Sequence, residues 1–319
     1  MSQKYSLIFY RLQESDVSAL ALSQALSRNR FRPCGQTQQT SMGWVAPRGE
    51  HEDALVEEIA GQQILCLRTE RRKVPAHAVK KRATELADEI QEQTGRKPGK
   101  REMRELKEQA LMELLPRAFP QASDTLVWIS PATDLLCVFA SSQARADDVT
   151  TQLSKACEGL KMSLLNTQTS PAVAMTHWLT ENEAPYAFSI DSECELRSTD
   201  EQKAIARFTR QDLARSNVVE HVTEGKVPAW VALTWRERVS FVLTASFQLK
   251  KVQLLDVVME DVEDVDLADT DAAFETNMTL LTQQLLELLQ DLLLALDGEL
   301  QSGSPQSEGV QPAQELATA

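Results

Sequence analysis

The chain has 319 residues, of which 42% are hydrophobic and 5% aromatic, and this length predicts two or three domains rather than a single core. Its net charge of −14 argues against a protein that is basic throughout, but the charges are segregated: residues 256–319 hold 15 acidic and no basic side chains, and the first 255 residues hold 33 basic and 32 acidic ones. The most apolar segment, Leu280–Leu296, is interrupted by polar residues and is too short to cross a bilayer, so we expect no membrane-spanning segment.

The first part of the chain predicts an α+β domain. A strand is expected at Tyr5–Leu12, where apolar and β-branched residues alternate with polar ones, and a helix follows at Ser15–Arg28. The order of the remaining elements predicts an antiparallel sheet with helices and an insertion, so that the domain comprises residues 1–74 and 119–168. These elements are strands at Met42–Val45, Gln63–Arg68, Thr125–Ile129 and Leu135–Phe139 and a helix at Ser141–Cys157.

The insertion, residues 75–118, predicts a helical hairpin. Val79, Ala83, Leu86 and Ile90 are spaced to form one apolar stripe on a helix. Gly and Pro residues at 95–99 end this helix, and a second one is expected from Lys100 to Leu115. The window Arg71–Lys107 contains 12 basic and 6 acidic residues, so we expect a basic arm. Such an arm can contact phosphates without reading sequence, although charge alone also fits a merely solvated helical face.

Residues 169–300 predict a second α+β domain. Its expected elements lead to a closing helix that begins near Asp269. This helix carries apolar residues at alternating steps of four and three, namely Phe274, Met278, Leu281, Leu285, Leu288 and Leu292. This spacing fits a helix that packs into a core, and it also fits a contact between subunits. We expect residues 301–319 to be disordered, because they are rich in Gln, Ser, Pro and Gly. The other elements expected in this domain are helices at Ser170–Leu179 and Ser216–Glu224 and strands at Ala187–Ile190, Ala204–Phe208, Ala229–Trp235, Val239–Thr244 and Lys250–Val257.

No group of residues in the sequence matches a catalytic or cofactor-binding motif. The phosphate-binding, dinucleotide-binding, zinc-protease and hydrolase patterns are absent from the sequence. The acidic run Asp264, Asp266, Asp269, Asp271 and Glu275 lacks the glycine and the spacing of a calcium loop, so a solvated acidic edge is the better interpretation. The five cysteines form no CxxC pair, and Cys66 and Cys137 lie in apolar runs typical of buried thiols. We therefore expect no enzyme activity, no cofactor and no metal, in a soluble protein of the reducing cytoplasm.

Several sequence blocks together resemble the recombination-associated protein RdgC family, over about residues 5–299. The blocks are Phe31-Arg-Pro-Cys-Gly35, Met42-Gly-Trp-Val45 with Pro47, Leu114-Leu-Pro-Arg-Ala-Phe119 with Trp128, Gln211-Asp-Leu213, and Leu233-Thr-Trp235.

The resemblance implies a ring-shaped homodimer with a positively charged hole that holds double-stranded DNA of any sequence. It also implies a nucleoid-associated cytoplasmic protein that restrains the RecA recombinase in homologous recombination. By the same resemblance, the arm meets its twin in the second copy, with Phe119 at that contact, and Arg117, Arg210 and Gln211 match positions at the DNA path or its gate. Thr209 departs from the family, which usually has a second basic residue there. From the arm and the resemblance together, the DNA-binding residues expected are Lys73, Lys80, Lys81, Arg96, Lys97, Arg117, Arg210 and Gln211.

Two other functions remain open from the sequence. The chain could be a scaffold that binds a protein partner through its Leu-rich last helix, in which case reversing the charge of the arm would not affect partner binding. It could also be an uncharacterised hydrolase or nuclease, which would require a metal site.

Overall fold

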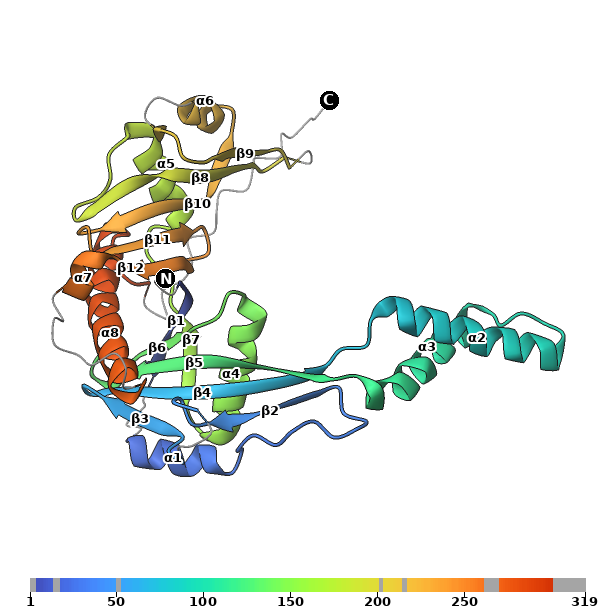
Figure 1. Ribbon diagram of the computed structural model, residues 1–319. Helices are drawn as coiled ribbons and strands as arrows, with labels where there is room; N and C mark the ends of the chain where they lie inside the picture. The colour runs from blue at the N-terminus through green and yellow to red at the C-terminus, as the bar shows by residue number, and fades with distance from the viewer. Residues whose placement is uncertain are drawn as a thin grey trace, which may run out of the picture.

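The computed structural model describes residues 4–13, 18–49, 53–200, 203–213, 217–260 and 270–300 (Figure 1). The acidic residues 261–269 and the tail expected to be disordered, 301–319, lie outside this described part. The elements up to residue 164 are β1 (Tyr5–Gln13), α1 (Ala19–Ser27), β2 (Thr40–Val45), β3 (Val56–Ile59), β4 (Gln62–Arg72), α2 (Ala76–Thr94), α3 (Lys100–Leu114), the 3-10 turn η1 (Leu115–Arg117), β5 (Pro120–Ser130), the 3-10 turn η2 (Pro131–Thr133), β6 (Leu135–Val138), α4 (Gln143–Ala156) and β7 (Lys161–Leu164).

The strands of the described residues form one continuous antiparallel sheet in the order β2-β4-β5-β6-β1-β12-β11-β10-β8-β9, with β3 paired to β4 and β7 to β1. The α+β class with antiparallel strands is confirmed. The sequence predicts two units with their own sheets, whereas here β1 pairs with β6 on one side and with β12 on the other. The elements after residue 164 are α5 (Pro171–Glu181), β8 (Phe188–Ser198), β9 (Ile205–Phe208), α6 (Val218–Thr223), β10 (Lys226–Trp235), β11 (Val239–Thr244), β12 (Leu249–Leu254), α7 (Asp256–Glu260) and α8 (Thr270–Ala295).

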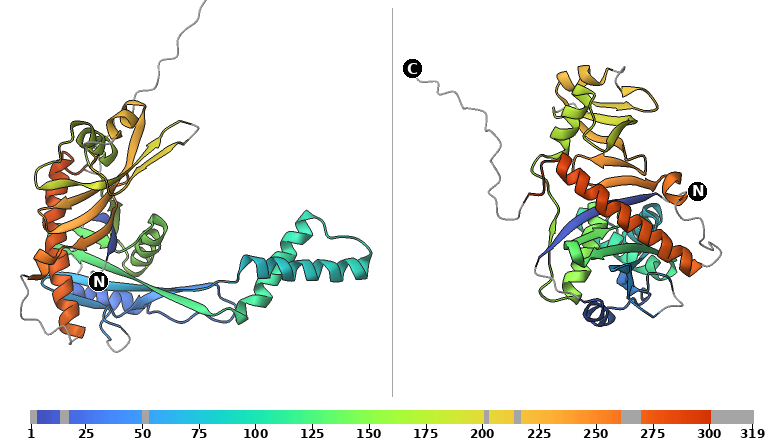
Figure 2. Two further views of the ribbon diagram at one scale, coloured as in Figure 1. Left: turned by 45° about the horizontal axis from the view of Figure 1, so that its top comes forward. Right: turned by 90° about the vertical axis from the view of Figure 1, so that its left-hand side faces the viewer.

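The molecule has an open outline, because two parts project from the sheet in the same direction. The hairpin of α2 and α3 extends far from the body on the long ribbon of β4 and β5, and the tip formed by β8 and β9 points to the same side (Figures 1 and 2). Residues Gln63–Arg72 of β4 pair with Pro120–Ile129 of β5 without a register shift, which makes this ribbon a continuous support for the arm.

Helix α8 covers one face of the sheet and lies on the side away from the arm (Figure 2). Leu285, Leu288 and Leu292 are fully buried, in a core to which β1, β5 and β6 contribute on one side and β10, β11 and β12 on the other. The sequence left open whether this helix packs into the core or joins two subunits. The structure buries its apolar stripe inside the chain, so this stripe offers no free surface to a partner.

On the other face, α1 and α4 cover the half of the sheet that contains β1 to β6. The arm has a separate small core of Ala83, Leu86, Ala87, Leu106 and Ala110, where α2 and α3 pack against each other. The predicted apolar stripe of the first arm helix is therefore confirmed at Ala83 and Leu86.

Gly43 in β2 allows an unusually close crossing of two chain segments. A Cβ atom at this position would lie 2.3 Å from the Cα of Phe31. The close approach lets the Phe31 N–H donate to the carbonyl of Trp44 over 3.0 Å and the Trp44 N–H donate to the carbonyl of Asn29 over 3.0 Å. Only glycine leaves room for this crossing. The Phe31 and Met42–Val45 blocks, which are separate in the sequence, therefore lie against each other in the fold.

Several predicted boundaries were wrong. Two short strands, β3 and β7, were missed, because four residues with charged or polar members give no clear alternation. Strand β12 ends at Leu254 rather than Val257, because α7 begins at Asp256. Strands β4, β5 and β8 are longer than expected, because their polar ends continue as ribbons beyond the apolar core.

Replacing a fully buried leucine of α8 should destabilise the whole sheet. Leu285→Ala removes side-chain atoms from a packed core, and we expect the free energy of unfolding to fall by about 2–5 kcal/mol. Urea denaturation followed by circular dichroism measures this change. The matched control is Leu294→Ala on the same helix, where the side chain is 77% exposed and little should change. Equal effects of the two variants would contradict the packing of α8 described here.

Candidate nucleic-acid interface

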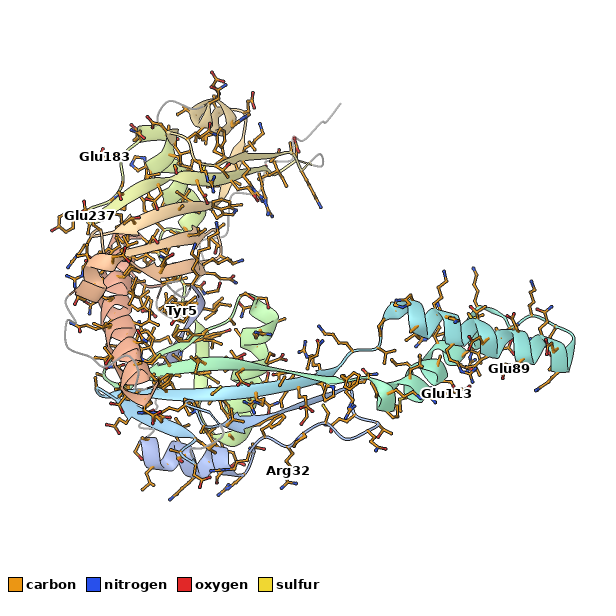
Figure 3. All side chains as sticks on the ribbon, viewed as in Figure 1. Tyr5, Arg32, Glu89, Glu113, Glu183 and Glu237 are labelled. Atoms are coloured by element: carbon orange, nitrogen blue, oxygen red, sulfur yellow. The ribbon has the colours of Figure 1, made fainter. Side chains whose placement is uncertain are left out.

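The arm carries exposed lysines on a hairpin whose arginines are engaged in ion pairs. Lys80 and Lys81 lie in the second turn of α2, are exposed, and form no ion pair with any described residue. Arg82, the next residue, binds Glu113 of α3 at 2.8 Å and also contacts Glu85 and Glu89. Figure 3 labels Glu89 and Glu113 on the two helices that Arg82 joins.

The expectation of a strongly basic hairpin needs correction. Residues 76–114 hold nine basic and eight acidic side chains. The window Arg71–Lys107 is more basic because it includes Arg71, Arg72 and Lys73, which precede the hairpin, and ends before Glu108 and Glu113. Arg101 pairs with Glu105 and Arg104 with Glu108. The hairpin therefore has almost no net charge, and its available positive charge lies on the lysines that no carboxylate neutralises.

The predicted site residues at the arm's tip, Arg96 and Lys97, differ in their availability. Arg96 donates two hydrogen bonds to Glu102, at 2.6 and 2.9 Å, and Glu102 also accepts the backbone N–H of Gly99 at 2.8 Å. The Arg96 guanidinium and this N–H lower the pKa of Glu102 to about 2. Arg96 thus closes the loop between the helices, whereas Lys97 is exposed and makes no ion pair among the described residues.

At the base of the arm, Arg117 ends η1 and Phe119 precedes β5. Both side chains are exposed, Phe119 to 89%. The segment between them is held by Arg72, whose guanidinium donates to the carbonyl of Ala118 at 2.6 Å. Arg72 therefore attaches this segment to the end of β4, and Arg117 and Phe119 are exposed on either side of it.

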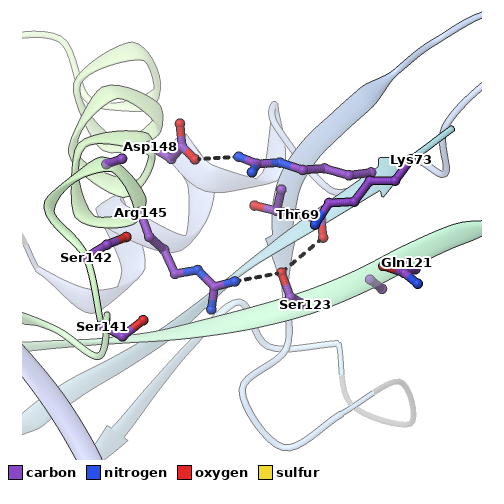
Figure 4. Close-up of a pocket in the computed structure, with 11 residues that line it drawn as sticks. Thr69, Lys73, Gln121, Ser123, Ser141, Ser142, Arg145 and Asp148 are labelled. Atoms are coloured by element: carbon purple, nitrogen blue, oxygen red, sulfur yellow. Dashed lines mark hydrogen bonds and ion pairs between the residues drawn. The ribbon is translucent and has the colours of Figure 1, made fainter. Parts of the chain in front are cut away.

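A groove of about 370 Å³ lies between the ribbon and the beginning of α4 (Figure 4). Arg71, Lys73 and Arg145 line it against a single carboxylate, Asp148, which binds Arg71 at 3.0 Å. Arg145 donates to the hydroxyl of Ser123 at 3.3 Å. Lys73 was expected from the sequence but Arg145 was not, because it lies 72 positions further along the chain and is the only basic residue between Arg117 and Lys155. Only the packing of α4 beside β4 brings these cations together.

The predicted pair Arg210 and Gln211 lies far from the arm, beyond β9 at the edge of the sheet. Both side chains are exposed, and the Gln211 N–H donates to the carbonyl of Ser192 in β8 at 3.4 Å. The predicted site residues thus fall in three places: the arm, the base of the arm with its groove, and the edge next to β8. The structure does not bring them into one cluster within a single copy.

The acidic run gives no cation site in the described part. Asp264, Asp266 and Asp269 lie outside the described residues. Asp271 and Glu275 both contact Arg48, Glu275 at 2.5 Å. Among the residues that the structure describes, no three His, Cys, Asp or Glu side chains gather as a metal site would require. The helices of this part include none long and apolar enough to cross a membrane.

Comparison with known proteins identifies the family. The family model described as "Putative exonuclease, RdgC" matches residues 5–299. The chain belongs to the RdgC family. A relative named recombination-associated protein RdgC from Cupriavidus pinatubonensis is 40% identical over 88% of this chain and 93% of its own length. One of the same name from a Janthinobacterium species is 38% identical over 93% and 98%, respectively. The family resemblance inferred from the sequence blocks is confirmed, and it links this chain to recombination.

The Arg96–Glu102 pair gives a test of the arm in solution. Because the pKa of Glu102 is lowered, the stabilisation from its charged form is present above the ordinary value of 4.5 and is lost as the pH falls through about 2. Arg96→Gln should raise the pKa of Glu102 toward 4.5, as measured by carboxyl carbon NMR titration. Arg101→Gln, which removes the neighbouring pair, should leave it unchanged. Identical titration of Glu102 in both variants would show that this ion pair does not form.

Proposed function

We propose that this protein binds double-stranded DNA without sequence preference, as a homodimer that closes into a ring around the duplex, and restrains RecA in homologous recombination by occupying DNA. The proposal rests on the outline of the chain, in which two projections lie on the same side of the sheet. The arm and the β8–β9 tip project to the same side, and unneutralised lysines lie on the arm while three cations line the groove at its base. Membership of the RdgC family supports the link to recombination.

Two-fold symmetry would complete the site. An isologous dimer presents each surface patch twice, so two such chains would place the exposed lysines and the groove on both sides of one opening. The exposed Phe119 at the base of the arm is then an apolar contact for the second copy. Helix α8 and its acidic residues lie on the opposite side of the sheet, so that repulsion of phosphates is weakest where the arm projects.

The described surface favours phosphate contact over base reading. Lysines on a solvent-exposed helix supply point charges on flexible stems, and such contacts give affinity without sequence information. The scaffold alternative is not favoured, because the Leu-rich stripe on which it depends is buried in α8. Nuclease activity is the competing function, because the description of the family model contains the word exonuclease. Incubating closed circular DNA with the protein and a divalent cation tests it.

Charge reversal on the arm should weaken binding to all duplex sequences alike. Lys80→Glu removes one phosphate contact and adds repulsion, so we expect lower affinity and a slope of log affinity against log salt that is reduced by about 1. Fluorescence anisotropy with several unrelated duplexes measures both. Arg28→Glu, an equal charge change at the exposed end of α1, is the control and should have a smaller effect. Equal losses in the two variants would mean that only net charge matters.

Ring closure should make release from DNA depend on topology. We expect closed circular duplexes to retain the protein at a salt concentration that releases it from linear duplexes, because a ring on a circle has no end from which to slide. Gel shifts across a salt series measure retention. The same circles, incubated with the protein and Mg²⁺ or Mn²⁺, should stay closed. Equal release from both forms would contradict encirclement, and nicking would support the nuclease.

A further inference from the structure

The sheet has a second basic surface that the family comparison does not assign. One face of β8 to β12 packs against α5, α6 and α8, and no helix of the described part covers the opposite face. An open groove of about 440 Å³ lies on this uncovered face, lined by Trp230 of β10 together with basic side chains from three strands. These are Arg197 of β8, Arg207 of β9, and Lys250 and Lys251 of β12.

A β-bulge brings the two lysines to the same face. Leu249 and Val252 are fully buried, so strict alternation between them would turn only one side chain to the groove. Instead the register with β11 shifts at this point, and Lys251 has a φ of 52°. Both Lys250 and Lys251 line the groove as a result. A non-glycine residue in the left-handed region costs free energy, and bulges often redirect side chains beside functional sites.

A buried carboxylate orients the two arginines. Glu195 is fully buried and accepts hydrogen bonds from Arg197 at 2.7 Å and from Arg207 at 2.8 Å. Burial alone would raise the pKa of Glu195, but these hydrogen bonds outweigh it and hold the pKa below its ordinary value. The arginine side chains remain 58% and 61% exposed. One negative charge thus fixes two guanidinium groups whose outer edges can still reach a phosphate.

Lysine adds further positive charge at the same place. Lys250 forms no ion pair with any described residue, and Lys251 pairs with Glu193 at 3.2 Å. The groove thus has four basic side chains, and only two carboxylates, Glu195 and Glu193, contact them. The groove therefore keeps a positive charge that a phosphate chain can neutralise.

Trp230 differs in its burial from the other four tryptophans. Trp44, Trp128, Trp178 and Trp235 are all buried. Trp230 is only half-buried and lines the groove. Its ring lies 5.8 Å from the ammonium of Lys251. An aromatic ring amid cations is the arrangement by which proteins bind single-stranded nucleic acid, with bases stacked on the ring and phosphates on the cations.

We propose that this groove binds an unpaired nucleotide of DNA, with the base stacked on Trp230 and the flanking phosphates on Arg197, Arg207 and Lys250. A base inside a duplex has both faces covered by its neighbours, so the indole selects single-stranded DNA over duplex. This inference rests on the proposed function in requiring that the protein binds DNA, and it adds a separate site for strands that are open or being exchanged.

The test compares a short oligothymidylate with a duplex, by anisotropy, on the full-length protein. Trp230→Ala should weaken binding of the oligothymidylate about 5- to 150-fold, as loss of one stacked base does, and should leave duplex binding unchanged. Trp230→Phe retains an aromatic face and should keep most of the affinity. Tyr186→Ala, at an aromatic side chain that is 90% exposed elsewhere on the surface, is the matched control and should have no effect.

Unchanged duplex binding by Trp230→Ala also shows that the variant is folded. An unchanged affinity of Trp230→Ala for the oligothymidylate, or an equal loss for oligothymidylate and duplex, would overturn the stacking site while leaving the proposed function intact. A wild-type protein that binds the oligothymidylate through Trp230 but ignores duplex would instead overturn duplex encirclement alone. Failure to bind either DNA would overturn both.

Discussion

The pairing of β1 on both of its edges is the constraint on which the rest of the structure depends. β1 pairs with β6 through Ile8–Arg11 and with β12 through Tyr5 and Leu7, so one strand belongs to both halves of the sheet. Helix α8 packs across the same junction, in a core shared by the two halves. A hinge between separate domains would let the arm and the β8–β9 tip move independently. The shared strand and helix instead fix the direction in which both project, and thereby the open outline that the proposed function requires.

Arginine and lysine have different roles in the arm. Its arginines form ion pairs that join α2 to α3, close the loop between them, or link neighbouring turns of α3. These roles suit a planar group that donates several hydrogen bonds. Its lysines at 80, 81 and 97 remain solvated and are available to phosphates. Exposed pairs contribute little stability each, but they remove positive charge from contact with DNA. A count of basic residues therefore overstates the binding surface of the arm.

The sequence blocks that identify the family serve different physical purposes. Gly43 and its neighbours are fixed by a close backbone crossing, and Trp128 and Trp235 are buried, with their N–H groups satisfied. These residues maintain the fold. Arg117 and Phe119 are exposed at the base of the arm and make no contribution to that core, so packing does not explain them. Residues of this second kind are those for which a binding role gives the better account.

Periodicity in the sequence determined the helical hairpin, the last helix, most strands and the α+β class, because apolar spacing is a local property that neighbouring residues impose. The sequence also identified the family, through several short blocks of residues that the overall composition does not reveal. Tertiary structure alone decided that β1 unites the halves, that the stripe of α8 is buried, and that Arg145 joins Arg71 and Lys73. It also placed Trp230 among Arg197, Arg207 and two lysines. Such groupings depend on strand order, on a bulge and on ion-pair partners distant in sequence, and a linear pattern of residue types contains none of these.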